Sequence, residues 1–237
     1  MAYKLLEAFK SLFEGNEYRH RDSTQGDYVA SFLIDDVYSL NRSANLKAAV
    51  DSRQSVLNVR NKTVGRAHRR GDGSFGAAVP SIEPQLIPET YVVALGEVAS
   101  IEIGAEVKIF AKAMIKQLDR VGTDMINQAD EFKRSNPAAI RVGIVGINYA
   151  NVYRGLEGER EYITTGRGGY AHPAQEAAQA EQRLVARVSS HFDELIVLRF
   201  VATNMPPLEF SWRDETQLTK EYGAALVRIA ALYETRF

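Results

Sequence analysis

Apolar side chains recur along the chain in two patterns, one typical of amphipathic helices and one typical of buried strands. Near the N-terminus, Leu5, Phe9 and Leu12 follow helical spacing, which predicts a helix over residues 1–14. Farther on, residues 140–149 form a continuous apolar run of the kind found in strands that are covered on both faces. The pattern therefore predicts a chain that combines helices with interior strands.

The same criteria predict the remaining elements. Further helices are predicted where apolar positions repeat at helical spacing, over 27–41, 44–50, 111–134, 174–192 and 214–232. Strands are predicted where β-branched and aromatic residues cluster, over 54–60, 91–95, 100–110 and 195–203. Glycine and proline predict loops over 71–90 and 151–173. From residue 91 the order is strand, strand, helix, strand, helix, strand, helix, which indicates an α/β fold with a mixed central β-sheet flanked by helices.

The length of 237 residues suits one large domain. Within it we expect an N-terminal helix and linker over 1–26, a core over 27–203 and a C-terminal helix over 204–237. Hydrophobic residues make up 45% of the chain and charged residues 25%. This composition is ordinary for a globular protein, and it excludes a chain that is disordered or coiled coil throughout.

Cysteine is absent, which excludes disulfides, thiolate metal sites and a cysteine nucleophile. No apolar run approaches the roughly 18 residues of a membrane span, so we expect no membrane contact. Charged residues interrupt the apolar positions near the N-terminus, where a signal peptide needs an unbroken apolar core. We therefore expect a cytoplasmic protein.

The net charge of −1 conceals an uneven distribution. Residues 42–70 contain eight basic residues and one acid, a charge of +7 that leaves −8 for the rest of the chain. Such asymmetry is typical of a surface that binds a polyanion. The alternative is a solvated basic surface with no specific partner.

The predicted strand 100–110 carries unusual side chains for so apolar a segment. Because side chains alternate along a strand, Glu102, Gly104, Glu106 and Lys108 are expected to share one face. Burying two carboxylates and an ammonium is unfavourable unless they pair or bind a cation. Carboxylate oxygens are suitable ligands for a hard divalent ion such as Mg²⁺.

The tripeptide Glu106-Val107-Lys108, on a strand followed by a long helix, resembles the E-x-K half of the PD-(D/E)XK nuclease superfamily. Restriction endonucleases and many phage-defence nucleases belong to it. The resemblance implies a restriction endonuclease-like core over 27–203. It implies a Mg²⁺-dependent endonuclease that hydrolyses DNA phosphodiester bonds, with Mn²⁺ able to substitute, and a role in restriction or phage defence.

In that family the first acidic metal ligand lies on the preceding strand, and this chain offers two candidates. Asp72 is flanked by glycines beside the basic segment, a setting that allows close approach to a phosphate backbone. Glu89 follows Pro88 and would lie opposite Glu106 if 91–95 and 100–109 form a hairpin. Asp72 is preferred and Glu89 is kept as the alternative.

The resemblance also implies roles for these residues. Glu106 and Asp72, or Glu89, would ligate the metal, and Lys108 would orient the attacking water and stabilise charge at phosphorus. Glu102 is a candidate for a supporting acid or a ligand of a second metal ion. The residues expected to contact DNA phosphates are basic and lie before and after the strand: Arg66, Arg69, Arg70, Lys112 and Lys116.

DNA is thus the expected partner, and a homodimer or higher homo-oligomer is expected because cutting two strands needs two sites. The rival interpretation is a catalytically silent α/β module that holds nucleic acid or protein through the basic segment 42–70. A weaker rival is a nucleotide-binding enzyme, since 71–76 has the G-x-G-x-x-G spacing. That motif needs a strand before it and a helix after it, which the pattern here does not predict.

Overall fold

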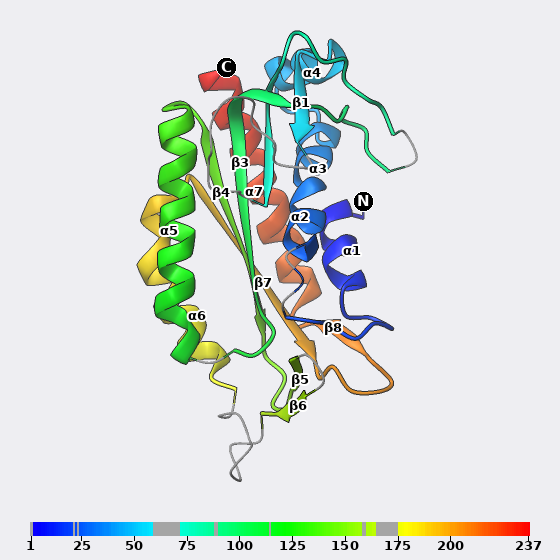
Figure 1. Ribbon diagram of the computed structural model, residues 1–237, viewed down its shortest axis with the longest axis vertical. Coiled ribbons are helices and arrows are strands. Elements are labelled where there is room, and N and C mark those ends of the chain that lie inside the picture. Colours follow the sequence, from blue (N-terminus) through cyan, green and yellow to red (C-terminus); the bar gives the residue numbers. More distant parts are fainter. Residues whose placement is uncertain are drawn as a thin grey trace.

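A mixed six-stranded sheet forms the centre of the protein and carries helices on both faces (Figure 1). In the computed structural model the strand order is β1-β2-β3-β4-β7-β8. The structure describes residues 2–20, 22, 24–58, 72–87, 90–113, 115–157, 160–164 and 175–237. The α/β class and the mixed sheet predicted from the sequence are confirmed.

The strands of the main sheet are β1 (Ser55–Asn58), β2 (Gly73–Ala78), β3 (Val98–Phe110), β4 (Ile140–Asn148), β7 (Glu194–Ala202) and β8 (Phe210–Trp212). Strands β1, β2 and β3 form an antiparallel meander, and β3, β4 and β7 are parallel. Strand β8 returns antiparallel to β7. A separate hairpin consists of β5 (Arg154–Glu157) and β6 (Arg160–Ile163).

The α-helices are α1 (Lys4–Ser11), α2 (Thr24–Ser31), α3 (Leu33–Ser39), α4 (Ala44–Asp51), α5 (Leu118–Ser135), α6 (Ala177–Val188) and α7 (Glu215–Arg236). Two short 3₁₀ turns, η1 (Ile115–Gln117) and η2 (Ser189–His191), adjoin α5 and α6. Helices α5 and α6 cover one face of the sheet, and α1, α2, α3 and α7 cover the other (Figure 1). Each face therefore has its own apolar core.

Several predicted boundaries shift. The helix predicted over 27–41 is divided at Phe32 into α2 and α3, and the helix predicted over 111–134 begins only at Leu118. The C-terminal helix predicted over 214–232 begins within one residue of its predicted start, where the Asp214 carboxylate accepts a hydrogen bond from the Gln217 amide at 2.9 Å and caps the helix. Before Leu118, residues 111–113 are not helical and Ile115–Gln117 form the 3₁₀ turn η1.

The strand beside β3 is not the predicted one. Residues 91–95 form no strand, and β2, which lies within the predicted loop 71–90, pairs with β3 instead. The prediction was wrong because β2 is built from small residues of low β propensity. Their size is required: a Cβ on Gly73 would lie 2.8 Å from that of Ala30, and one on Gly76 would lie 2.0 Å from the Ser100 carbonyl oxygen.

An irregularity in the β2–β3 pairing reverses the expected position of Glu102. Phe75 pairs with Ile103 and Gly76 pairs with Ile101, so Glu102 is an extra residue on β3. Its carboxylate accepts hydrogen bonds from Ser55 Oγ at 2.9 Å and Tyr233 Oη at 2.6 Å. Gly104, in contrast, packs against Phe132 of α5 on the other face. The expectation that Glu102 shares a face with Glu106 and supports a metal there is therefore corrected.

Two adjacent buried carboxylates on α3 connect the N-terminal helix to the rest of the fold. Asp36 accepts hydrogen bonds from the first amides of α1, at Lys4 and Leu5, and from the Tyr222 hydroxyl of α7 at 2.8 Å. Asp35 accepts hydrogen bonds from the Lys4 ammonium and from the Val92 amide. Burial raises the pKa of Asp36 although these donors oppose the shift. Both carboxylates therefore have a structural explanation.

Among the described residues, no helix combines the length and the apolarity that a membrane crossing requires.

The pH dependence of stability can be tested at Asp193, which joins β7 to the C-terminus. Burial opposes its ionisation, but hydrogen bonds from Arg141 and Arg236 outweigh burial and hold its pKa well below the usual range. The ionised carboxylate contributes to the free energy of unfolding above about pH 4. This contribution is lost as the pH falls toward the pKa of Asp193 in the folded state. We expect D193N to lower the free energy of unfolding by about 1–2 kcal/mol at pH 7, and the difference to shrink below pH 4.

Urea unfolding at pH 7, 4 and 3 measures this difference. The control is D119N, since Asp119 pairs with Arg187 but its side chain is 87% exposed, and we expect a change below about 0.5 kcal/mol. An equal loss for D193N at pH 7 and pH 3 would contradict the assignment.

Candidate active site

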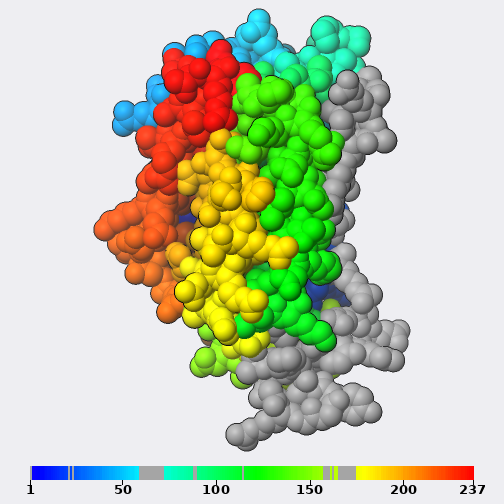
Figure 2. Space-filling view, turned by 90° about the vertical axis from the view of Figure 1, so that its left-hand side faces the viewer, coloured from blue at the N-terminus to red at the C-terminus, as the bar shows by residue number. Residues whose placement is uncertain are grey.

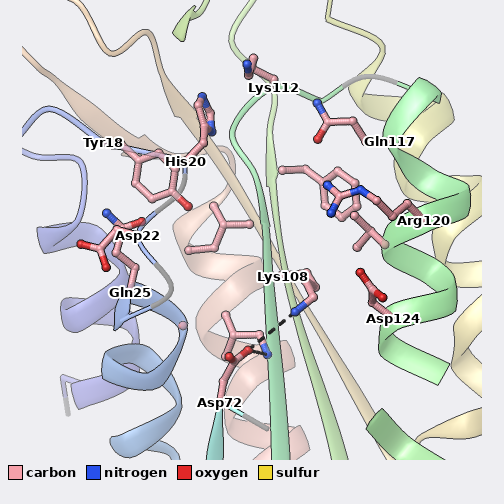
Figure 3. Close-up of a pocket in the computed structure, with 15 residues that line it drawn as sticks. Tyr18, His20, Asp22, Gln25, Asp72, Lys108, Lys112, Gln117, Arg120 and Asp124 are labelled. Carbon is pink, nitrogen blue, oxygen red and sulfur yellow. Dashed lines mark hydrogen bonds and ion pairs between the residues drawn. The ribbon is translucent and has the colours of Figure 1, made fainter. Parts of the chain in front are cut away.

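A pocket of about 530 Å³ opens along one edge of β3, beyond the point where its pairing with β2 ends (Figure 3). The last pair joins Gly73 to Ala105, so among the described strands residues 106–110 have no partner on this edge. Helix α2 and the segment before it form one wall, and the start of α5 forms the other. The strand edge thus becomes the floor of a cleft.

Asp72 lies at this edge because β2 pairs with β3 in a register that ends at Gly73. It immediately precedes β2, and its Oδ2 accepts a hydrogen bond from the Val107 amide at 2.8 Å. This carboxylate takes the place of the next residue of the β2 ladder. Helix α2 holds it from the other side, because a Cβ on Gly26 would lie only 2.9–3.1 Å from the Asp72 carboxyl atoms.

Glu106 and Lys108 lie beside Asp72 on β3. Alternation along the strand directs Val107 into the core under α2 and directs its two neighbours to the α5 face. The Lys108 ammonium donates a hydrogen bond to Glu106 Oε1 and lies 4.0 Å from Asp72 Oδ2. The Glu106 side chain is 6% exposed and that of Lys108 is 28% exposed. The structure therefore brings Asp72, Glu106 and Lys108 together at one strand edge.

The three charges depend on one another. Burial lowers the pKa of the Lys108 ammonium, but the carboxylates of Glu106, Asp72 and Asp124 outweigh burial and raise it above its ordinary value. The ammonium is therefore charged at neutral pH and compensates two neighbouring carboxylates. Without a cation at this point, those carboxylates would repel each other in a poorly solvated place.

The donor set fits a hard divalent cation in part. Asp72 and Glu106 present carboxylate oxygens to one positive centre, which is the arrangement that Mg²⁺ prefers. Within the described ranges, no cluster of three or more histidine, aspartate or glutamate side chains is placed to hold a metal. An ion here would complete its coordination with water and substrate oxygens, as Mg²⁺ commonly does.

The other walls of the pocket come from two segments far apart in the sequence. The N-terminal wall contributes Tyr18, His20, Asp22 and Gln25, and the α5 wall contributes Gln117, Arg120 and Asp124. The N-terminal wall is fastened by the buried Asn204, whose amide group bonds both the Tyr18 amide and the Tyr18 carbonyl. The sequence does not predict this wall, because nothing in its local pattern indicates which strand these residues lie against.

The residues predicted to contact DNA differ in where the structure places them. Lys112 is 5% exposed and lines the pocket, whereas Lys116 is exposed on η1 and is not among the lining residues. Both lysines lie within the helix predicted over 111–134 but precede α5, which begins at Leu118. The other predicted DNA-contacting residues lie outside the described residues: Arg66, Arg69 and Arg70. Glu89, the alternative to Asp72 as the first metal ligand, also lies outside them.

Comparison with protein-family models, with curated proteins and with solved structures found no match for this chain. The function of the site is therefore inferred from its own geometry and chemistry.

The dependence of Glu106 on Lys108 predicts a stability effect. We expect K108M to lower the free energy of unfolding by about 2–4 kcal/mol at pH 7, because it removes the ammonium that donates a hydrogen bond to the buried Glu106 carboxylate. The double variant E106Q/K108M should recover most of that loss, since the amide carries no charge. Urea unfolding of the three proteins tests this coupling, and a double variant no more stable than K108M would contradict it.

Proposed function

We propose that the protein is a metal-dependent nuclease with a restriction endonuclease-like core, which hydrolyses phosphodiester bonds of DNA. The observation that carries the proposal is the convergence of Asp72, Glu106 and Lys108 at one open strand edge. Each comes from the position that the PD-(D/E)XK resemblance implies. An E-x-K tripeptide alone is common in proteins. Far fewer proteins also place an acidic side chain from the start of the adjacent strand beside it, as Asp72 lies here.

The element order supports the same proposal. A leading helix, α2, is followed after α3 and α4 by the meander β1-β2-β3, then by α5 and the parallel strand β4. The resemblance implies this succession of helix, three-stranded meander, helix and strand. In this order Glu106 lies on the third strand of the meander and Asp72 lies directly before the second, which supports the proposal.

The chemistry follows from the charges of these side chains. A bound Mg²⁺ or Mn²⁺ would supply Lewis acidity and an activated water, and Asp72 and Glu106 would hold it. Lys108 would donate hydrogen bonds from its ammonium to the attacking water or to a phosphoryl oxygen, where negative charge increases during the reaction. Because the carboxylates keep this ammonium charged, Lys108 is better suited to stabilising an anion than to accepting a proton.

The proposal includes DNA as the substrate and an oligomeric protein that cuts both strands. It also includes a role in restriction or phage defence. The second candidate is a catalytically silent binding module that uses the basic segment 42–70. Within its described part, Lys47 pairs with Asp51 and lies over the Tyr38 ring, so one of its cations has a local structural role. The intact acid–lysine–acid group favours the nuclease over this alternative.

Plasmid cleavage with Mg²⁺ or Mn²⁺ tests the proposal directly. We expect D72N and E106Q to reduce cleavage at least about a hundredfold, with weaker Mg²⁺ binding, because each removes a metal ligand. K108M should reduce cleavage about 10²–10⁴-fold, yet its Mg²⁺ affinity should not fall, because removing an ammonium leaves more negative charge for the ion.

The control for these variants is E83Q, which changes an exposed carboxylate outside the pocket. Metal-independent DNA binding by the wild type without any cleavage would favour the silent module. Full cleavage by K108M or E106Q would refute the site.

The close approach of Gly26 to Asp72 gives a second test. In G26A the new methyl group must displace the flexible carboxylate and not the backbone, so we expect about tenfold weaker Mg²⁺ affinity with little loss of stability. The matched control is G223A, a helical glycine whose Cβ would lie 2.6 Å from the Tyr3 hydroxyl, away from the pocket. Calorimetric Mg²⁺ titration of both variants measures the effect, and equal affinities would show that Gly26 does not position Asp72.

A further inference from the structure

The pocket is acidic at one end and basic at the other. Asp72, Asp124 and the buried Glu106 surround Lys108 at one end, and Lys112, His20 and Arg120 line the other (Figure 3). Figure 3 shows Lys112 and His20 well away from Asp72, with Arg120 directed into the pocket from α5. A metal at the acidic end would therefore have an anion-binding region beside it.

The spacing of Arg120 and Asp124 along α5 indicates how far apart the basic and acidic ends of the pocket lie. They are one helical turn apart on the same face of α5, which is about 6 Å along the helix axis. Asp124 acts electrostatically on Lys108 at the acidic end of the pocket. Arg120 lies one turn earlier on α5, on the side of the pocket that Lys112 lines. A separation of this order matches neighbouring phosphates of a nucleic acid strand.

Lys112 is held more firmly than a surface lysine. Its neighbours Ala111 and Ala113 are clamped by the Gln175 amide, which accepts from the Ala113 amide at 2.8 Å and donates to the Ala111 carbonyl at 3.1 Å. Asn148, fully buried, donates to the same Ala111 carbonyl at 3.0 Å. The backbone that carries Lys112 is therefore fixed from two directions.

The side chain of Lys112 is also accommodated by its surroundings. Gly155 of β5 provides its space, since a Cβ there would lie 3.2 Å from the Lys112 Nζ. A lysine with 5% exposure at a pocket wall has little of the conformational freedom that an exposed lysine loses on binding. Such a preorganised ammonium is suited to a fixed anion.

We propose that Lys112 and Arg120, with His20 facing them, form a subsite for the phosphate next to the scissile one. Arg120 provides a forked donor that suits phosphate oxygens, and Lys112 provides a point charge. The strand would then lie along the open edge of β3, with one phosphate at each end of the pocket. This inference rests on the proposed nuclease function for the identity of its ligand.

The test measures binding in the absence of divalent metal, so that it does not depend on cleavage. The probe is a fluorescent single-stranded thymidine octamer, titrated in EDTA over a range of salt concentrations. We expect R120Q to weaken binding about tenfold and to reduce the slope of log K against log salt by about one, as loss of one phosphate contact does.

The matched control is R134Q, because Arg134 lies on the same helix, is 69% exposed and pairs with Glu131 away from the pocket. It should bind as the wild type does. K112M should weaken binding at least as much as R120Q, and its folding is checked by urea unfolding because Lys112 is buried. Arg120 is exposed, so R120Q gives a result even if K112M does not fold.

Inorganic phosphate serves as a competitor in the same titration. If inorganic phosphate competes only at concentrations far above those of the octamer, the ligand is a phosphate of a nucleic acid strand. If inorganic phosphate binds as tightly as the octamer does, that assignment is overturned. Unchanged affinity and salt slope in R120Q would refute the subsite, even if the wild type cuts plasmid. Loss of octamer binding in R120Q from a wild type that never cuts would instead support the subsite and refute the nuclease.

Discussion

The hydrogen bond from the Val107 amide to the Asp72 carboxylate determines much of what this protein can do. It ends the β2–β3 ladder with a side chain in place of a backbone group, and β3 continues for three further residues past Val107. An unpaired strand edge is ordinarily a liability that proteins cover. Here α2, the segment before it and α5 cover it incompletely, and the uncovered part is the pocket.

Charge compensation at that edge connects the fold to the proposed chemistry. Asp72 and Glu106 are brought together by strand pairing, and Lys108 neutralises them from within the same strand. A group of this kind is tolerated only because the attraction between its members offsets their loss of solvation. The same balance makes the place receptive to a divalent cation, since a second positive centre can share these carboxylates with the Lys108 ammonium.

The walls of the pocket depend on contacts made far from it. Asp35 and Asp36 fasten α1 to α3, α7 and the segment at Val92, and Asn204 fastens the Tyr18 backbone beside β5. These buried polar side chains satisfy backbone groups that no helix or strand satisfies. They hold the N-terminal segment against the sheet, where His20 and Asp22 complete the pocket.

Local sequence was sufficient for the parts of the protein that local forces specify. Apolar and β-branched residues predicted the strands β4 and β7, helical spacing predicted a helix from residue 214, and the alternation in β3 predicted that Glu106 and Lys108 share a face. It failed where partners distant in sequence decide the outcome. The small residues of β2 resemble a loop until α2 and β3 pack against them, and the extra residue at Glu102 turns that carboxylate to the opposite face. Tertiary structure alone therefore placed Asp72 at the edge of β3 and brought His20 and Arg120 to the same pocket, because cross-strand register and packing, which no local pattern encodes, determine which side chains meet.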